Sequence, residues 1–236
     1  MTGSDRSDST DRTARLTGLA YLGLAGCGLV GFLLIRSRLY APDDAATTAA
    51  RLVAHEGLAR VGLAADLGVV LTQALAALGF FRVFRRVDGV AAASVAAFGL
   101  VNAVVVLVAT VFSATSLEVA LAGAAGPSTG AAAAQVQLLY HLEGAAWRIG
   151  GLFFGLWLIP MGRAALRSGA VPPLLGRLLV VGGVGYLVGT FVGQLAPDVP
   201  AVADLLVVPA TVGEFWMIGY LLVRGAGKRP RVLVPA

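Results

Sequence analysis

The chain has 236 residues, of which 58% are hydrophobic and only 13% are charged, and its mean hydropathy is +0.84. Because roughly a quarter of the residues in a soluble globular domain are charged, this composition excludes an ordinary soluble domain. The net charge of +5 does not indicate a nucleic-acid partner, since the basic residues flank apolar stretches and do not cluster on one face. We therefore expect an integral membrane protein whose first partner is the lipid bilayer, with no nucleic acid bound.

Six apolar stretches are long enough to cross a bilayer, which takes about 20 residues in a helix. In chain order they cover residues 16–35, 58–81, 90–112, 144–166, 174–195 and 205–223. They predict an all-α polytopic membrane protein with six transmembrane helices in one bundle. We expect this domain at residues 13–225, between a disordered cytoplasmic tail (1–12) and a basic cytoplasmic tail (226–236).

The connections between the stretches also have patterns. Residues 36–59 are polar, and Asp44 is placed to cap a short outer amphipathic helix over residues 45–56 that ends at Gly57. Residues 113–130 contain Gly-Pro-Ser-Thr-Gly and predict a loop, whereas residues 131–143 favour a helix that leads into the fourth span. Glycines at four-residue spacing on the fifth span, Gly185, Gly189 and Gly193, predict close helix contacts, within one chain or between copies in an oligomer.

The basic residues alternate along the chain in a way that predicts its orientation. Thirteen of the 18 Lys and Arg residues lie in the two tails and in the second and fourth connections, and five lie elsewhere. By the positive-inside rule, both termini are then cytoplasmic. Seventeen of the 18 are Arg, a bias typical of GC-rich bacteria, so we expect a bacterial protein.

Polar side chains within the spans are the candidates for function, because burying them in a membrane is costly unless they are paired or used. The predicted topology places them in the outer half of the membrane or at its midplane, which predicts an outward-facing polar pocket around Asp66, Arg148 and Glu214. The full set of predicted binding residues is Asp66, Asn102, His141, Arg148, Gln194 and Glu214.

Four interpretations of these residues stay open. They could form a structural network in which Arg148 pairs with Asp66 or Glu214 while Asn102 and Gln194 make interhelical hydrogen bonds. A small-molecule binding protein or transporter would use Arg148 as an anion anchor. An enzyme would use Asp66 and Glu214 as acid and base on a lipid or isoprenoid substrate, as small membrane terpene cyclases do. A metal site would combine ligands from His55, His141, Asp66, Glu143 and Glu214, but no recognised ligand spacing is present, so we expect no metal and no cofactor.

Several phrases in this order resemble a known bacterial membrane family, called domain of unknown function 4386. They are TARLTGLAYL, RSRLYAPDDAATTAARLVAHEGLARVGLAADL, GGLFFGLWLIPMGRAALRSG, PPLLGRLLVVGGVGYLV and GEFWMIGYLLVRG. The resemblance covers residues 13–225 and implies six helices in a plasma membrane. It implies no activity, catalytic residue or binding residue. We therefore predict a membrane protein that binds or transports a small molecule, with the enzyme as the alternative.

Overall fold

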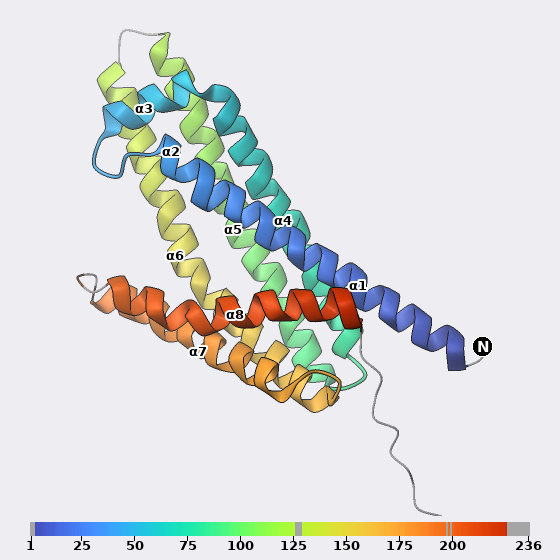
Figure 1. Ribbon diagram of the computed structural model, residues 1–236. Helices are drawn as coiled ribbons and strands as arrows, with labels where there is room; N and C mark the ends of the chain where they lie inside the picture. Colours follow the sequence, from blue (N-terminus) through green and yellow to red (C-terminus); the bar gives the residue numbers. More distant parts are fainter. Residues whose placement is uncertain (1–2, 126–128, 197, 199, 226–236) are drawn as a thin grey trace, which may run out of the picture. The chain divides into compact units, whose positions relative to one another are not determined.

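The computed structural model describes residues 3–125, 129–196, 198 and 200–225 (Figure 1). All regular structure among these residues is helical. The elements are α1 (Gly3–Gly28), the π-helical η1 (Leu29–Arg36), α2 (Ser37–Leu39), α3 (Ala45–Ala54), α4 (Glu56–Phe84), α5 (Gly89–Ala124), α6 (Thr129–Ser168), α7 (Pro173–Leu195) and α8 (Pro200–Arg224).

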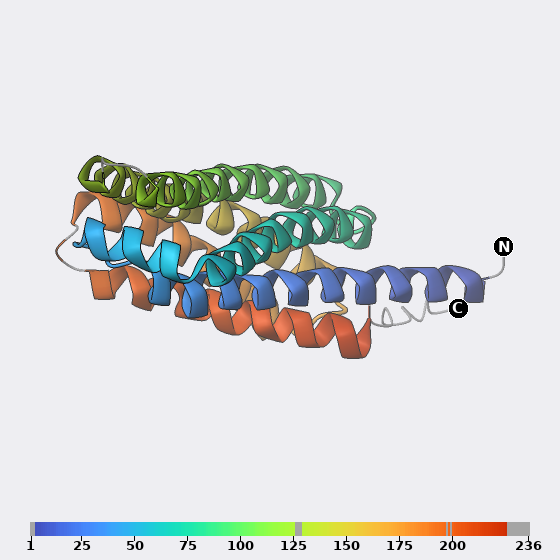
Figure 2. The ribbon, with the colours of Figure 1, turned by 90° about the horizontal axis from the view of Figure 1, so that it is seen from above.

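Six helical stretches in the described residues are long and apolar enough to cross a membrane. They are Asp11–Leu39, Glu56–Phe84, Gly89–Ala124, Gly130–Ser168, Pro173–Leu195 and Asp204–Arg224. The first runs without a break from α1 through η1 to α2 (Figure 2). This confirms the all-α fold with six spans, and the chain is a multi-pass membrane protein.

The predicted domain bounds depend on where the two terminal tails begin and end. α1 begins at Gly3, inside the stretch expected to be a disordered tail, and the predicted basic tail at 226–236 lies outside the described residues. The domain bounds therefore stay a prediction.

The chain divides into two compact units. Unit 1 comprises residues 1–22, 73–102 and 151–236, and unit 2 comprises residues 23–72 and 103–150.

Glycines hold α6, α7 and α8 together in unit 1, where α7 and α8 lie side by side (Figure 1). A Cβ atom at Gly155 of α6 would lie 2.6 Å from the carbonyl oxygen of Gly183 in α7. On α7, a Cβ at Gly182 would overlap Ala210 of α8, and one at Gly185 would overlap the carbonyl oxygen of Leu206. Of the three glycines predicted to make close contacts, Gly185 therefore makes one within the chain, whereas the prediction was wrong for Gly193, where a Cβ would meet no atom within 4 Å. Contact between copies of the chain stays a prediction.

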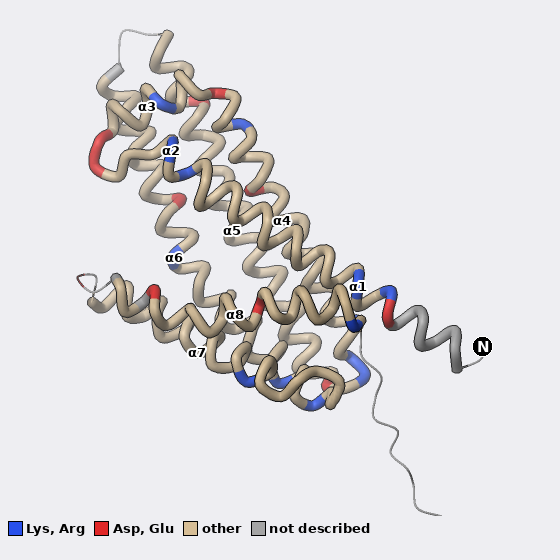
Figure 3. Tube along the Cα trace, in the orientation of Figure 1, with Lys and Arg blue, Asp and Glu red and all other residues tan. Residues whose placement is uncertain are grey.

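Asp88 fixes the start of α5 in unit 1. Its carboxylate accepts a hydrogen bond from the backbone N–H of Ala91 at 3.0 Å and one from the Arg167 guanidinium at 2.5 Å. The Ala91 bond, followed by the charge of Arg167, lowers the pKa of Asp88 below its usual value. Basic residues gather at the α4–α5 and α6–α7 turns (Figure 3), so Asp88 ties these two turns of unit 1 together.

The short helix α3 belongs to unit 2 and begins as predicted. Asp44 accepts hydrogen bonds from the Thr47 hydroxyl at 2.6 Å and the Thr47 backbone N–H at 2.8 Å, and these bonds lower the pKa of Asp44. Leu52 of α3 is buried in a core formed with residues of α2, η1, α4, α5 and α6. α3 ends at Ala54, and Gly57, expected to end it, lies in the first turn of α4.

The prediction of a loop over residues 113–130 was wrong for residues 113–124, which continue α5, and for residues 129–130, which begin α6. Leu117 and Ala120 recur at helical spacing and pack against Val136 of α6, so burial extends the helix beyond its most apolar part. Thr115 donates its hydroxyl hydrogen to the carbonyl oxygen of Val111, which satisfies a polar side chain within the helix. The predicted helix over residues 131–143 is confirmed as part of α6.

Candidate functional site

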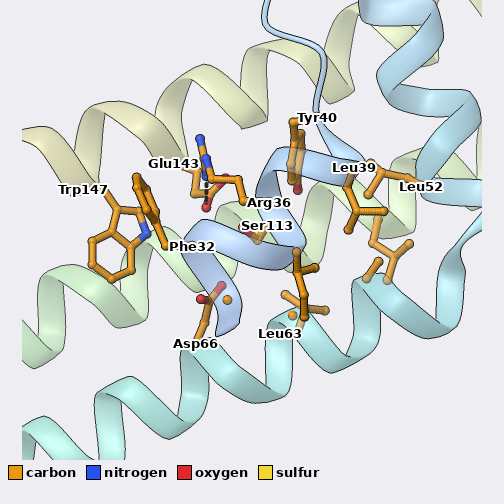
Figure 4. A pocket seen from close by; sticks show the side chains of 15 residues that line it. Phe32, Arg36, Leu39, Tyr40, Leu52, Leu63, Asp66, Ser113, Glu143 and Trp147 are labelled. Atoms are coloured by element: carbon orange, nitrogen blue, oxygen red, sulfur yellow. Dashed lines mark ion pairs between the residues drawn. The ribbon is translucent and has the colours of Figure 1, made fainter. Parts of the chain in front are cut away.

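A buried ion pair lies at the centre of unit 2. Arg36, the last residue of η1, pairs with Glu143 of α6, and both side chains are largely buried, at 14% and 5% exposure (Figure 4). The eight residues of π-helix η1 end at Arg36, and this rare conformation is frequent at functional sites. Because an unpaired charge in a membrane is costly, each of these two groups depends on the other.

Aromatic rings surround the Arg36 guanidinium. Its Cζ lies 4.4 Å from the centre of the Tyr140 ring, 5.4 Å from that of Tyr40 and 5.7 Å from that of Phe32. The Tyr40 and Tyr140 rings are stacked, with centres 4.5 Å apart. Ring faces attract a cation, so this cage favours the charged arginine without a second carboxylate.

Asp66 of α4 faces the same region from the opposite side (Figure 4). A Cβ atom at Gly31 of η1 would lie 2.9 Å from an Asp66 carboxyl oxygen, so the carboxyl group packs directly against that helix because residue 31 has no side chain. Asp66 makes no hydrogen bond or ion pair with any described residue, although it is only partly exposed.

Asp66, Arg36 and Glu143 line one small cavity of about 30 Å³, together with Tyr40 and Ser113. That volume holds about one or two water molecules. The cavity thus has two carboxyl groups and one guanidinium, and its polar groups come from η1, α4, α5 and α6 and from Tyr40, which follows α2.

Two further predicted residues of unit 2, His141 and Arg148, lie exposed on α6. The Arg148 guanidinium lies close to Gly144, where an added Cβ would be 3.2 Å from Arg148 Nη1 and 3.2 Å from Arg36 Nη2. Among the described residues of its unit, Arg148 has no carboxylate partner. One open interpretation paired Arg148 with Asp66 or Glu214; the buried ion pair of unit 2 joins Arg36 and Glu143.

In unit 1, Glu214 of α8 accepts a hydrogen bond from the Tyr21 hydroxyl of α1 at 2.6 Å. The Tyr21 ring meets the Trp157 and Phe80 rings edge-on, with centres 5.3 and 5.4 Å apart. Tyr21 and Trp157 are almost fully buried. Glu214 therefore sits against an aromatic cluster of its own unit.

The predicted amide residues differ in their surroundings. Asn102 is fully buried, and its side chain makes no hydrogen bond to another described residue, so the expected interhelical bond is not seen there. Gln73, also in unit 1, is fully buried and has no such bond either. Gln194, at the end of α7, is exposed.

The family model for the domain of unknown function DUF4386 matches residues 16–225. The chain belongs to the DUF4386 family. No curated protein and no solved structure matched the chain. The suspected family is therefore confirmed, and the match assigns no activity.

In this DUF4386 protein, the predicted site residues fall into two sets. Asp66, His141 and Arg148 belong to unit 2, whereas Asn102, Gln194 and Glu214 belong to unit 1. The single pocket expected around Asp66, Arg148 and Glu214 stays a prediction. No group of three or more His, Cys, Asp and Glu side chains in the described part of the chain could hold a metal ion.

The central ion pair of this DUF4386 protein was not predicted from the sequence. Arg36 follows an apolar run directly, so it was counted as a flanking charge of the first span, and Glu143 was considered only as a metal ligand. One signal was available. Phe32, Arg36 and Tyr40 recur every four residues, which places them on one face if the helix continues past residue 35.

Proposed function

We propose that this membrane protein binds one small cation, a proton or a monovalent metal ion, at the Asp66 cavity of unit 2, as a step in binding or transporting its substrate. The observation that carries the proposal is the charge balance of the cavity. Arg36 makes its ion pair with Glu143, and Asp66 makes no ion pair with a described residue. An unpaired carboxylate in a membrane is costly, so one further positive charge stabilises the site.

The size of the cavity supports a proton or a small ion. A volume of about 30 Å³ has room for about one or two water molecules and excludes a larger organic ligand unless the helices move apart. The Ser113 and Tyr40 hydroxyl groups supply oxygen atoms beside the two carboxyl groups. A substrate would then bind after, or together with, the cation.

The proposal is tested with purified protein in detergent. In the wild type, lowering the pH or replacing N-methylglucamine with Na⁺ is expected to raise the melting temperature, by about 3–6 °C when the site is roughly 90% occupied. Asp66→Asn removes the charge at nearly constant shape, so this variant should fold and lose the response. A response to acid alone identifies the proton, and a response to Na⁺ at constant pH identifies the metal ion.

Asp43→Asn is the matched control, because Asp43 is an exposed carboxylate of the same unit. This variant should keep the full response. If Asp66→Asn responds to acid and Na⁺ as the wild type does, Asp66 is not the binding group and the proposal fails.

A second candidate function is acid–base chemistry on a lipid or isoprenoid substrate. The observation that favours it is the Tyr21–Glu214 hydrogen bond beside the Trp157 and Phe80 rings, since aromatic faces stabilise cationic intermediates. A product found in lipid extracts of cells with the wild type, and absent with Glu214→Gln at equal expression, would favour this function over the first.

For the location, we propose a bacterial plasma membrane with both termini in the cytoplasm. The support is the distribution of basic residues, 13 of 18 in the tails and in the second and fourth connections.

A further inference from the structure

A second, larger cavity lies in unit 1, between the start of α5 and the second half of α6. It has a volume of about 230 Å³ and is a groove with an apolar wall formed by Phe98, Leu156 and Ile159. Asp88 and Arg163 also line the groove, and we call the end that they form its mouth. The groove is therefore amphipathic, with its charged end at the α4–α5 and α6–α7 turns.

The mouth has an excess of positive charge. The Asp88 carboxylate lies 2.5 Å from Arg167 and 3.5 Å from Arg163, so a single carboxylate faces two guanidinium groups. The Arg163 side chain is 61% exposed, which leaves it able to donate hydrogen bonds to another group. Three more arginines, Arg82, Arg85 and Arg86, lie on the adjoining end of α4 and the turn that follows. The charge of this end favours an anionic ligand.

The size and chemistry of the groove limit what it can hold. A volume of about 230 Å³ corresponds to about eight water-sized groups, enough for the first part of one hydrocarbon chain but not for two. Pro160, which also lines the groove, has no backbone N–H, so the carbonyl oxygen of Leu156 lacks its helical donor. An apolar groove with a cationic mouth, in a segment long and apolar enough to span a membrane, matches a lipid better than a water-soluble solute.

We propose that this groove binds an anionic phospholipid, with one acyl chain along Phe98, Leu156 and Ile159 and the phosphate accepting hydrogen bonds from Arg163. The site lies in unit 1 and shares no residue with the Asp66 cavity, so it goes beyond the proposed cation binding. Arg163→Gln should leave the fold intact, because Arg167 still holds Asp88.

The test titrates dioleoylphosphatidylglycerol into the purified protein in detergent and counts bound lipid by native mass spectrometry. Arg163→Gln should weaken binding by about five- to tenfold, because it removes the guanidinium that contacts the phosphate. Ser94→Phe, at a residue that lines the groove, should abolish binding by filling it. Arg177→Gln is the matched control, since Arg177 is an exposed arginine of α7 that does not line the groove. This variant should bind like the wild type.

Four outcomes would overturn the proposal. Equal losses in Arg163→Gln and Arg177→Gln would mean that diffuse surface charge attracts the lipid. Unchanged binding by Ser94→Phe would mean that no chain enters the groove. If dioleoylphosphatidylcholine binds as tightly as the anionic lipid, the site does not select an anionic headgroup. If inorganic phosphate displaces the lipid at equal concentration, the site does not select a phospholipid.

Discussion

Gly185→Ala is expected to destabilise the protein by about 1–3 kcal/mol or more, which would be seen as a clear fall in melting temperature in detergent. The new Cβ would overlap the carbonyl oxygen of Leu206, a backbone atom of α8 that cannot rotate away. The two helices would have to separate, and the contact between α7 and α8 would be lost along their length.

Gly193→Ala is the control on the same helix. A Cβ at residue 193 meets no atom within 4 Å. Because alanine favours a helix over glycine by about 1 kcal/mol, this variant should be as stable as the wild type or slightly more stable. Equal destabilisation by both substitutions would show that α7 does not pack on α8 as described.

Arg36→Leu is expected to destabilise the protein by about 3–5 kcal/mol, because it leaves the buried Glu143 carboxylate without its partner. Glu143→Leu should have a similar effect by leaving the guanidinium unpaired. The double variant Arg36→Leu/Glu143→Leu removes both charges and should recover most of the loss. Thermal or denaturant unfolding of the wild type, the two single variants and the double variant gives a double-mutant cycle. This cycle measures the coupling energy between Arg36 and Glu143.

The exposed pair Glu56–Arg60 of α4 provides the comparison. Its side chains are 42% and 63% exposed, and the atoms lie 2.7 Å apart. Glu56→Gln should change the unfolding free energy by about 0.2–1 kcal/mol, as is usual for a surface pair. If Arg36→Leu costs no more than Glu56→Gln, or if the double variant is worse than either single one, the Arg36–Glu143 pair does not hold unit 2 together.

Hydropathy predicted the number and order of the spans because crossing a bilayer demands a minimum apolar length, and the Asp44 cap was predicted because capping is local chemistry. The ends of the helices were harder to predict. α5 continues to Ala124 through Ser113 and Thr115, since packing of Leu117 against α6 outweighs the local polarity. A hydropathy window finds the apolar part of a helix and misses the more polar turns that continue it.

The candidate site was predicted in part. Asp66 was found because an acidic residue deep in an apolar run is conspicuous. Arg36 was missed because it stands at the end of an apolar run. The local sequence is the same whether such a side chain lies at the membrane surface or is buried inside the protein. Its partner Glu143 is distant in the sequence, and no local pattern joins them. Tyr21 was missed for a related reason, because a tyrosine near the start of a span is usually taken as an interfacial anchor.

The central claim is that the Asp66 carboxyl group takes its positive charge from outside the protein. The most direct measurement is the infrared spectrum of the protein in lipid nanodiscs, as a difference between the wild type and Asp66→Asn, at low and high pH and with or without Na⁺. We expect the C=O stretch of a protonated carboxyl at low pH without Na⁺, and its loss when the pH is raised or Na⁺ is added. A carboxylate band that is unchanged across all these conditions, like that of an exposed aspartate, would contradict it.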